Sequence, residues 1–195
     1  MNELSTMQDV TAAVLEFWFG GLDAKSAEVQ QPFWFKSTPE TDAEIRDRFG
    51  DVLDRAKRGA FDEDVRTSDD FLAIVIVLDQ FPRNIHRGTP DAYAADPLAL
   101  KWAKKAVAAG IDKRQPPPHR RMFLYLPFEH AESMDDQNES VRLFGEMGYD
   151  DFTKYAIAHR DVIEAYGRFP HRNGVLGRTS TPDEEEYLSR PGAGW

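Results

Sequence analysis

The chain has 195 residues, of which 41% are hydrophobic, and its 24 lysines and arginines against 34 acids give a formal net charge of -10. A chain of this length can bury one sizeable core, and an acidic surface repels a phosphate backbone, so we expect a single domain that does not bind nucleic acid. The absence of cysteine excludes disulfides and thiolate chemistry, and the lack of a basic leader or a long apolar run predicts a cytoplasmic protein without a membrane partner.

Apolar residues at helical spacing indicate amphipathic helices in four separate parts of the chain. Because an α-helix has about 3.6 residues per turn, side chains three and four positions apart lie on one face. The four stripes are Val10, Val14, Leu15 and Trp18; Ile45, Phe49, Val52, Leu53 and Ala56; Leu98, Trp102, Ala106 and Ala109, followed by Gly110; and Phe152, Tyr155, Ala156, His159, Val162, Ile163 and Tyr166.

Helix starts are indicated where a capping side chain directly precedes a proline. The side-chain oxygen can accept hydrogen bonds from the free amides of the first turn, and proline has no amide to lose. Four segments have this form: Thr38-Pro39, Thr89-Pro90, Asp96-Pro97 and Thr181-Pro182.

The run from Phe71 to Leu78 is apolar at every position, so its periodicity does not separate a strand from a helix. Its β-branched residues favour a strand. Against this, Ser68 with the two acids that follow it is a good helix start, and the chain offers no second convincing strand for pairing. We therefore expect a central, fully buried helix.

The second half of the chain contains a stiff connector and a polar tail. The prolines at 116–118 predict an extended connector into a helix from about His119, which Pro127 should end or kink. Residues 189–195 are expected to form a flexible tail unless Trp195 docks. The expected organisation is one α-helical domain over residues 1–188.

Two similar polar segments, residues 79–88 and 167–174, are the main functional signal. Each places a Phe-Pro pair before a group of Arg, His and Asn side chains. Arginines can bind carboxylates or phosphates with two hydrogen bonds, and several fixed cations without a counter-anion would repel one another. Arg83, Arg87, Arg168, Arg172 and Arg178, with Ser180 just before the helix at Pro182, therefore predict an anion site. The alternative is that these arginines bridge helix ends and surface acids.

His159 lies on the apolar stripe of its helix, so we expect it to be buried and to need hydrogen-bond partners. Candidate partners are His130, Glu132, Asp79 and Gln80. A carboxylate beside an imidazole fixes its tautomer, as a general base requires, which makes His130, Glu132 and His159 candidate catalytic residues. The alternative is a core histidine with satisfied hydrogen bonds.

Established ligand motifs are absent from the sequence. There is no metal-ligand spacing, no phosphate-binding glycine loop, no dinucleotide fingerprint and no nucleophile elbow. The sequence therefore indicates no metal and no cofactor.

Several longer motifs show a resemblance to a known family. Leu78-Asp-Gln-Phe-Pro-Arg-Asn84, Leu126-Pro-Phe-Glu-His-Ala-Glu132 and Gly167-Arg-Phe-Pro-His-Arg-Asn173 resemble the mostly bacterial family of unknown function numbered 924, with a match from Val14 to Leu188. The resemblance implies an all-α, tetratricopeptide-like array of antiparallel helices, about 8–10 in number. It implies no established reaction.

The family pattern coincides with the polar residues identified above. It covers Asp79, Gln80, Arg83, Asn84, Arg87, His130, Glu132, His159, Arg168, His171, Arg172, Asn173 and Arg178. The chain departs from the pattern at His86, Glu129 and Ala131, where an aromatic or apolar residue, Met and Ser are expected. His86 and Glu129 are therefore left out of the predicted site.

Three interpretations follow. In the first, the arginines hold an anionic small molecule while His130, Glu132 and His159 supply acid-base chemistry for hydrolysis or group transfer. In the second, a tetratricopeptide-like interaction module grips an acidic peptide. In the third, the polar cluster is purely structural. An enclosed pocket that contains His130 and His159 would favour the first, and the oligomeric state stays open.

Overall fold

Helices form the regular structure of residues 4–194, the part of the chain that this computed structural model describes, and no strand occurs in that range. The all-α class is therefore confirmed. The α-helices are α1 Met7–Phe19, α2 Pro39–Lys57, α3 Ser68–Asp79, α4 Phe81–Ile85, α5 Asp96–Ala108, α6 His119–Glu129, α7 Met134–Met147, α8 Asp150–Tyr166 and α9 Pro182–Leu188. Short 3-10 helices are η1 Ala24–Glu28, η2 Pro90–Ala92, η3 Asp112–Arg114 and η4 Pro170–Arg172.

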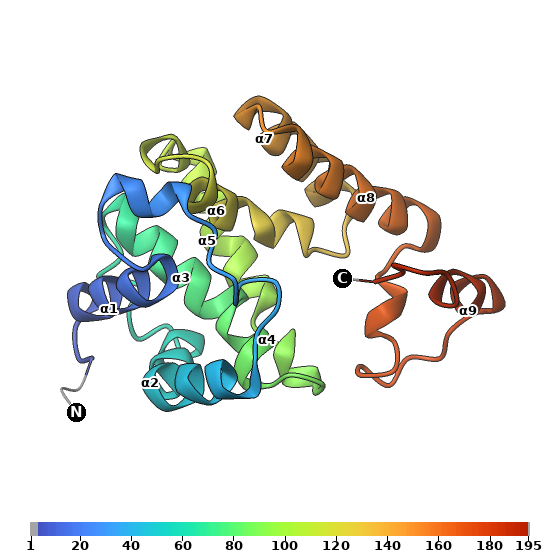
Figure 1. Cartoon of the computed structure of the whole chain (residues 1–195), viewed down its shortest axis with the longest axis horizontal. Helices are drawn as coiled ribbons and strands as arrows, with labels where there is room; N and C mark the ends of the chain where they lie inside the picture. Colours follow the sequence, from blue (N-terminus) through green and yellow to red (C-terminus); the bar gives the residue numbers. More distant parts are fainter. Residues whose placement is uncertain (1–3, 195) are drawn as a thin grey trace.

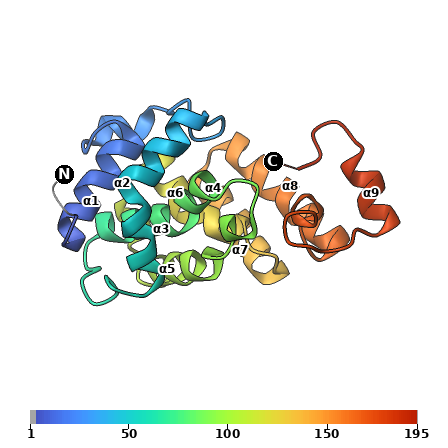
Figure 2. The same cartoon turned by 90° about the horizontal axis from the view of Figure 1, so that it is seen from below.

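The helix α3 runs through the middle of the larger body of the molecule (Figures 1 and 2). Contacts from α1, α2, α5 and α6 surround it, and every residue from Asp70 to Asp79 is buried. The predicted central helix is thus confirmed, because burial on all sides outweighs the strand propensity of its β-branched residues. No helix in residues 4–194 is long and apolar enough to cross a membrane.

The predicted helix starts have three different outcomes. Thr38 caps α2, and Thr181 caps α9 in a reciprocal capping box with Glu184. Thr89 precedes only the three-residue 3-10 helix η2. Asp96 is not a cap, because it lies inside the first turn of α5 and binds Arg83 with both carboxylate oxygens.

The helix predicted from about His119 is confirmed as α6, and Pro127 lies inside its last turn. Because proline lacks an amide and crowds the carbonyl four residues earlier, the helix continues for only two residues, to Glu129. His130 is the C-cap. The end of α6 therefore leaves Glu129 and His130 together beside the end of α3.

The chain after α8, residues 167–194, is called here the C-terminal segment. It begins at Gly167, whose φ of 69° gives a left-handed turn, and both views place it at the opposite end of the molecule from α1 (Figures 1 and 2). A second apolar cluster of Val162, Ile163 and Phe169 joins it to α8, apart from the main core.

The remaining expectations about architecture stay predictions. In a repeat array each unit contacts only its neighbours, whereas α3 also contacts α1, α5 and α6, so the tetratricopeptide-like arrangement remains an expectation of the resemblance. The domain bounds 1–188 and the flexible tail 189–195 also stay predictions. Trp195 lies outside the described residues, while Gly194 packs so closely on His171 that an added Cβ would lie 2.8 Å from the His171 Cβ.

Replacing Thr67 with alanine is expected to lower the free energy of unfolding by about 1 kcal/mol. Thr67, rather than Ser68, caps α3: its hydroxyl accepts from the Asp70 amide, and the Asp70 carboxylate accepts from the Thr67 amide. Urea unfolding of the variant measures the loss. Thr67→Ser keeps the hydroxyl and should unfold as the unaltered protein does; an equal loss in both variants would contradict the role of the cap.

Candidate functional site

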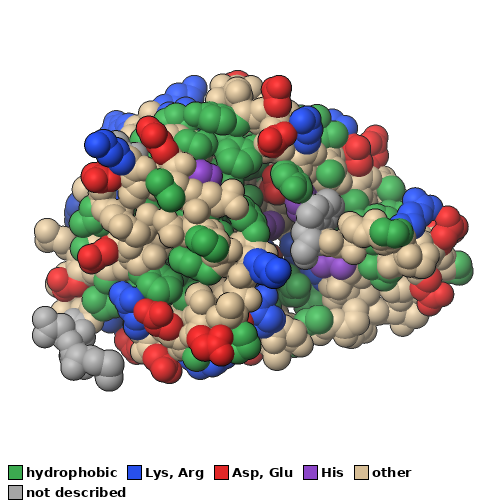
Figure 3. All heavy atoms as spheres, viewed as in Figure 1, with side chains coloured by type: hydrophobic (Ala, Val, Ile, Leu, Met, Phe, Trp, Pro, Cys, Tyr) green, Lys and Arg blue, Asp and Glu red, His purple; other side chains and the backbone are tan. Residues whose placement is uncertain are grey.

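A cavity of about 810 Å³ lies where the ends of α3 and α6 meet α8 and the C-terminal segment. This face of the molecule is hollowed between the larger body and the C-terminal segment, with histidine side chains near the hollow (Figure 3). The lining comes from the loop before α2, from α4 and the loop after it, and from α6, α7, α8 and η4. Chain segments more than eighty residues apart thus contribute to one site.

The structure divides the predicted site residues into two groups. Those that line the cavity are Gln80, Arg83, Asn84, Arg87, His130, His159, His171 and Arg172. Those that the cavity lining does not include are Asp79, Glu132, Arg168, Asn173, Arg178 and Ser180. Of the second group, Asp79 contacts the cavity-lining residues Gln80, Arg83 and His130 directly.

Asp79 is 0% exposed and organises the inner end of the site. Its Oδ1 accepts a hydrogen bond from His130 Nδ1 at 2.8 Å and lies 3.4 Å from Arg83 Nη1. Burial by itself would raise the pKa of this carboxyl, but the Arg83 charge and the His130 contact outweigh it and hold that pKa well below its usual range. The carboxylate is therefore charged, and it fixes His130 with its proton on Nδ1, which leaves Nε2 as the proton-accepting nitrogen.

Asp96, at the start of α5, joins the two Phe-Pro segments. It binds Arg83 at 2.9 and 3.1 Å and lies 3.5 Å from Arg172 Nη1. The two guanidinium groups share one carboxylate, although they are separated by almost ninety positions in the sequence. Asp96 therefore brings the two segments together at one place.

Arg172 is 7% exposed, although it carries a full charge. Its guanidinium carbon lies 4.6 Å from the ring centre of Tyr93 and 4.5 Å from that of Phe169, and its Nε has no hydrogen-bond partner among the described residues. Burial and the neighbouring Arg83 charge lower the pKa of this guanidinium. Of the arginines at the site, Arg172 has the weakest carboxylate contact.

Glu129 and His159 form a second buried pair. The carboxyl Oε1 lies 3.3 Å from His159 Nδ1, which also donates to the Tyr155 carbonyl oxygen at 2.8 Å. Burial raises the pKa of Glu129 to about 8, with a further contribution from the Asp79 charge, and burial lowers the pKa of His159 to about 3. Near neutral pH the pair is therefore an uncharged carboxylic acid beside a neutral imidazole.

Three further polar side chains, His171, Arg87 and Asn84, also line the cavity. Burial and the Arg172 charge lower the pKa of His171 to about 4, so this imidazole is also neutral near pH 7. At the outer edge Arg87 binds Asp42 with two hydrogen bonds of 2.8 and 3.0 Å, and Asn84 donates to the same carboxylate at 2.8 Å.

The other two predicted arginines, Arg168 and Arg178, form ion pairs that join parts of the C-terminal segment to one another and to Glu132. Arg178 binds Glu132 at 2.7 and 3.0 Å, and Arg168 binds Glu184 at 2.6 and 2.8 Å. The Asn173 amide donates to Ser180 and to Glu184. These charge-assisted bonds hold the segment that carries Arg172.

The premise that the five arginines lack counter-anions is wrong. Each has a carboxylate within 3.5 Å: Arg83 with Asp79 and Asp96, Arg87 with Asp42, Arg168 with Glu184, Arg172 with Asp96 and Arg178 with Glu132. The sequence carries 34 acids, and it does not indicate which of them fold against which cation.

Sequence reasoning missed several lining residues, chiefly Glu129 and the aromatic side chains Trp34, Phe35, Tyr93 and Tyr155. Glu129 was left out because it departs from the family pattern. A signal for it was present, since Met122, Leu126 and Glu129 share one helical face and all line the cavity. Trp34, Phe35 and Tyr93 lie in loops, where no periodicity marks their direction. Within residues 4–194 no group of three or more His, Asp and Glu is placed to hold a metal ion.

Comparison with known proteins identifies relatives of the whole chain. Residues 14–192 match the family described as bacterial protein of unknown function, DUF924. Among solved structures, the chain is similar to a protein of unknown function from Agrobacterium tumefaciens, ATU0120, with a TM-score of 0.84 and 38% sequence identity over 94% of this chain and 98% of that chain. No curated protein matches.

Proposed function

The chain belongs to the bacterial DUF924 family, which has no assigned function, and we propose from the site itself that the cavity binds an anionic small molecule on which its acid-base residues act. The chemistry that fits these residue types is hydrolysis or group transfer. The observation that supports it most is that Arg172 is buried, with one carboxylate at 3.5 Å and no hydrogen-bond partner for its Nε among the described residues.

Arg172 supports anion binding because its charge is buried and incompletely matched. Removing a guanidinium from water is costly unless a close anion and full hydrogen bonding replace the lost hydration. Asp96 lies 3.5 Å away and already forms the closer bidentate pair with Arg83. A carboxylate or phosphate in the cavity would give Arg172 the short, charge-assisted bonds that it lacks here.

His130 and Glu129 support acid-base chemistry at the same place. His130 has its tautomer fixed by Asp79, so its Nε2 is available to take a proton from a bound water or substrate group. Glu129 is a carboxylic acid near neutral pH and is therefore able to donate one. His159 positions Glu129 through the 3.3 Å contact.

Glu132, predicted as a catalytic residue, has a different role in this proposal. Its carboxylate accepts from Arg178 and from the Phe169 amide at 2.7 Å. It is thus a positioning residue that ties the start of η4 to the end of α6. Glu129 takes the acid role that the sequence suggested for Glu132.

Replacing Arg172 with glutamine is expected to weaken binding of an anionic ligand by about tenfold or more, equivalent to about 1.4 kcal/mol. A thermal-shift screen with phosphorylated metabolites, dicarboxylates and nucleotides should first identify an anion class that raises the melting temperature by mass action. Titration calorimetry of the variant with the best anion then measures the loss. Arg142→Gln, which removes an exposed arginine of α7 paired with Glu139 and Glu146, is the matched control and should bind normally.

Two results would contradict the proposal. One is a screen in which no anion gives saturable stabilisation; this would favour the tetratricopeptide-like interaction module that grips an acidic peptide, and a pull-down would follow. The other is unchanged anion binding by a folded Arg172→Gln protein, which would favour a purely structural role for the polar cluster.

A further inference from the structure

The cavity has two chemically different ends, and from them we infer that its ligand is an anion that carries an aromatic ring. The ring would pack against Phe35 and Tyr155 at the mouth, and the anionic group would reach Arg172 inside. This inference rests on the proposed function and specifies the class of ligand.

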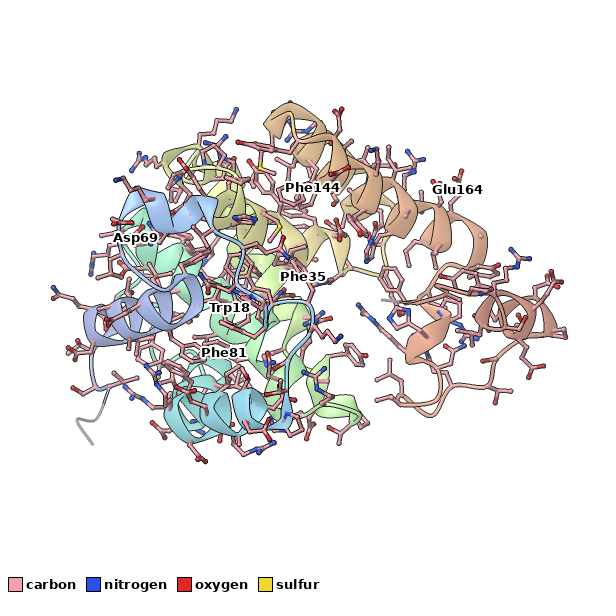
Figure 4. The ribbon with its side chains drawn as sticks, in the orientation of Figure 1. Trp18, Phe35, Asp69, Phe81, Phe144 and Glu164 are labelled. Atoms are coloured by element: carbon pink, nitrogen blue, oxygen red, sulfur yellow. The ribbon has the colours of Figure 1, made fainter. Side chains whose placement is uncertain are left out.

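Phe35 and Tyr155 are the first observation. They are 63% and 56% exposed, which makes them the two most exposed large aromatic side chains in residues 4–194, and both line the cavity. The rings of Trp18 and Phe81 pack in the core, whereas Phe35 lies on the loop that crosses the middle of the molecule (Figure 4). Exposed rings at the edge of a cavity are typical of a ligand contact rather than of a core.

The spacing along α8 is the second observation. Phe152, Tyr155 and His159 follow one another at intervals of three and four residues, so they lie on one face of the helix, and all three line the cavity. With a rise of about 1.5 Å per residue, Tyr155 and His159 are separated by roughly 6 Å along the axis. A ring packed on Tyr155 would therefore place a group attached to it beside the Glu129–His159 pair.

The difference in depth between the ends is the third observation. Arg172 is 7% exposed and packs on the face of Tyr93, and Arg83 lies 5.7 Å from the centre of the same ring. The Arg172 cation is thus inside and the two exposed rings are outside. A ligand whose anionic group enters first would place that group at Arg172 and its ring at Phe35 and Tyr155.

The size of the cavity agrees with a ligand larger than an inorganic anion. Its volume of about 810 Å³ lies in the range that holds organic ligands of roughly 300–1,000 Å³. Apolar side chains of Met122, Leu126 and Phe144 form part of its wall and offer nothing to a bare phosphate.

The test compares ligands that share an anionic head group and differ in the organic group attached to it. Calorimetry on the full chain with phenyl, cyclohexyl and methyl phosphate is expected to show about tenfold tighter binding of the phenyl than of the methyl compound, with cyclohexyl phosphate weaker than phenyl by about threefold. Phenylacetate against acetate forms a parallel arm that distinguishes a carboxylate from a phosphate head group. The double variant Phe35→Ala with Tyr155→Ala should reduce the phenyl advantage below about threefold and leave methyl phosphate binding unchanged. Leu22→Ala, which truncates an exposed side chain that does not line the cavity, is the control.

The outcomes separate this inference from the proposed function. Equal binding of phenyl and methyl phosphate, equal binding of phenyl and cyclohexyl phosphate, or a phenyl advantage that survives in the double variant would overturn the aromatic ligand while anion binding stands. Failure of every anion to bind would overturn the proposed function and this inference with it.

Discussion

Replacing Asp79 with alanine is expected to lower the free energy of unfolding by about 3–5 kcal/mol, the largest loss that we expect from a single substitution at the site. The carboxylate is 0% exposed and accepts from His130 and from the Gln80 amide. It is also one of two carboxylates beside Arg83. Truncation would leave the half-buried His130 imidazole and the buried Gln80 amide without their acceptor and Arg83 with Asp96 alone, and unsatisfied polar groups away from water cost more than a lost contact.

Urea unfolding at pH 7 measures this loss. Asp79→Asn keeps the size and one acceptor oxygen but not the charge, so it should lose less stability than Asp79→Ala. Asp91→Ala, at an exposed position of η2, is the control for removing a surface carboxylate and should change the unfolding free energy by less than about 0.5 kcal/mol. A loss below about 1 kcal/mol for Asp79→Ala would show that Asp79 does not organise the cluster.

Replacing Glu129 with glutamine is expected to remove a contribution that lowers the free energy of unfolding by about 2 kcal/mol between pH 6.5 and pH 8. Burial raises the pKa of Glu129 from 4.5 to about 8. Between these values the folded protein holds a proton that the unfolded chain has released, so the unfolding free energy falls as the pH rises through this window.

His159 and His171 act in the opposite direction below and around pH 6.5. Burial lowers the pKa of His159 to about 3 and that of His171 to about 4, so the unfolded chain binds protons that the folded protein does not. Their effect makes stability rise with pH through the ordinary pKa of histidine, about 6.5, and the rise fades by about pH 7.5. It is common to the unaltered protein and to Glu129→Gln, so the difference between the two proteins isolates the Glu129 effect.

The measurement is urea unfolding of the unaltered protein and the variant at several pH values from 6.5 to 8. Glu164→Gln is the matched control, because Glu164 lies on the outer face of α8, away from the cavity (Figure 4), and its loss should leave the pH dependence of stability unchanged. If the free energy of unfolding of the Glu129→Gln protein changed with pH as that of the unaltered protein does, the acid role proposed for Glu129 would fail.

Much of the helical framework could be predicted from local patterns. The apolar stripes at Ile45 to Ala56 and at Ala156 to Ile163 lie on helices whose buried faces they form. The capping residues Thr38 and Thr181 mark true helix starts, because a cap bonds to amides only two or three residues away. At residues 71–78 the local signal was ambiguous. The prediction of a helix there was correct, and it relied on the lack of a second strand for pairing.

The composition of the candidate site was also partly visible in the sequence. The two Phe-Pro segments and the histidines at 130 and 159 do line one cavity. Glu129 was missed because the family pattern was given more weight than its place on the helical face of Met122 and Leu126. The aromatic mouth was missed because Phe35 lies in a loop, whose side-chain directions follow from packing alone, and because Tyr155 was assigned to the apolar stripe of its helix.

The sequence by itself determined where the helices begin, which faces they bury and which polar segments are unusual, since these depend on contacts between residues a few positions apart. Only the tertiary structure decided the ion pairs. Arg83 and Arg172 meet at Asp96, and Arg178 binds Glu132, across separations that no local rule describes. The same packing placed Glu129 and Asp79 out of water. Their neighbours, not their residue type, then set the charge: Arg83 and His130 keep Asp79 ionised, whereas Glu129 is buried beside the Asp79 charge and keeps its proton near neutral pH.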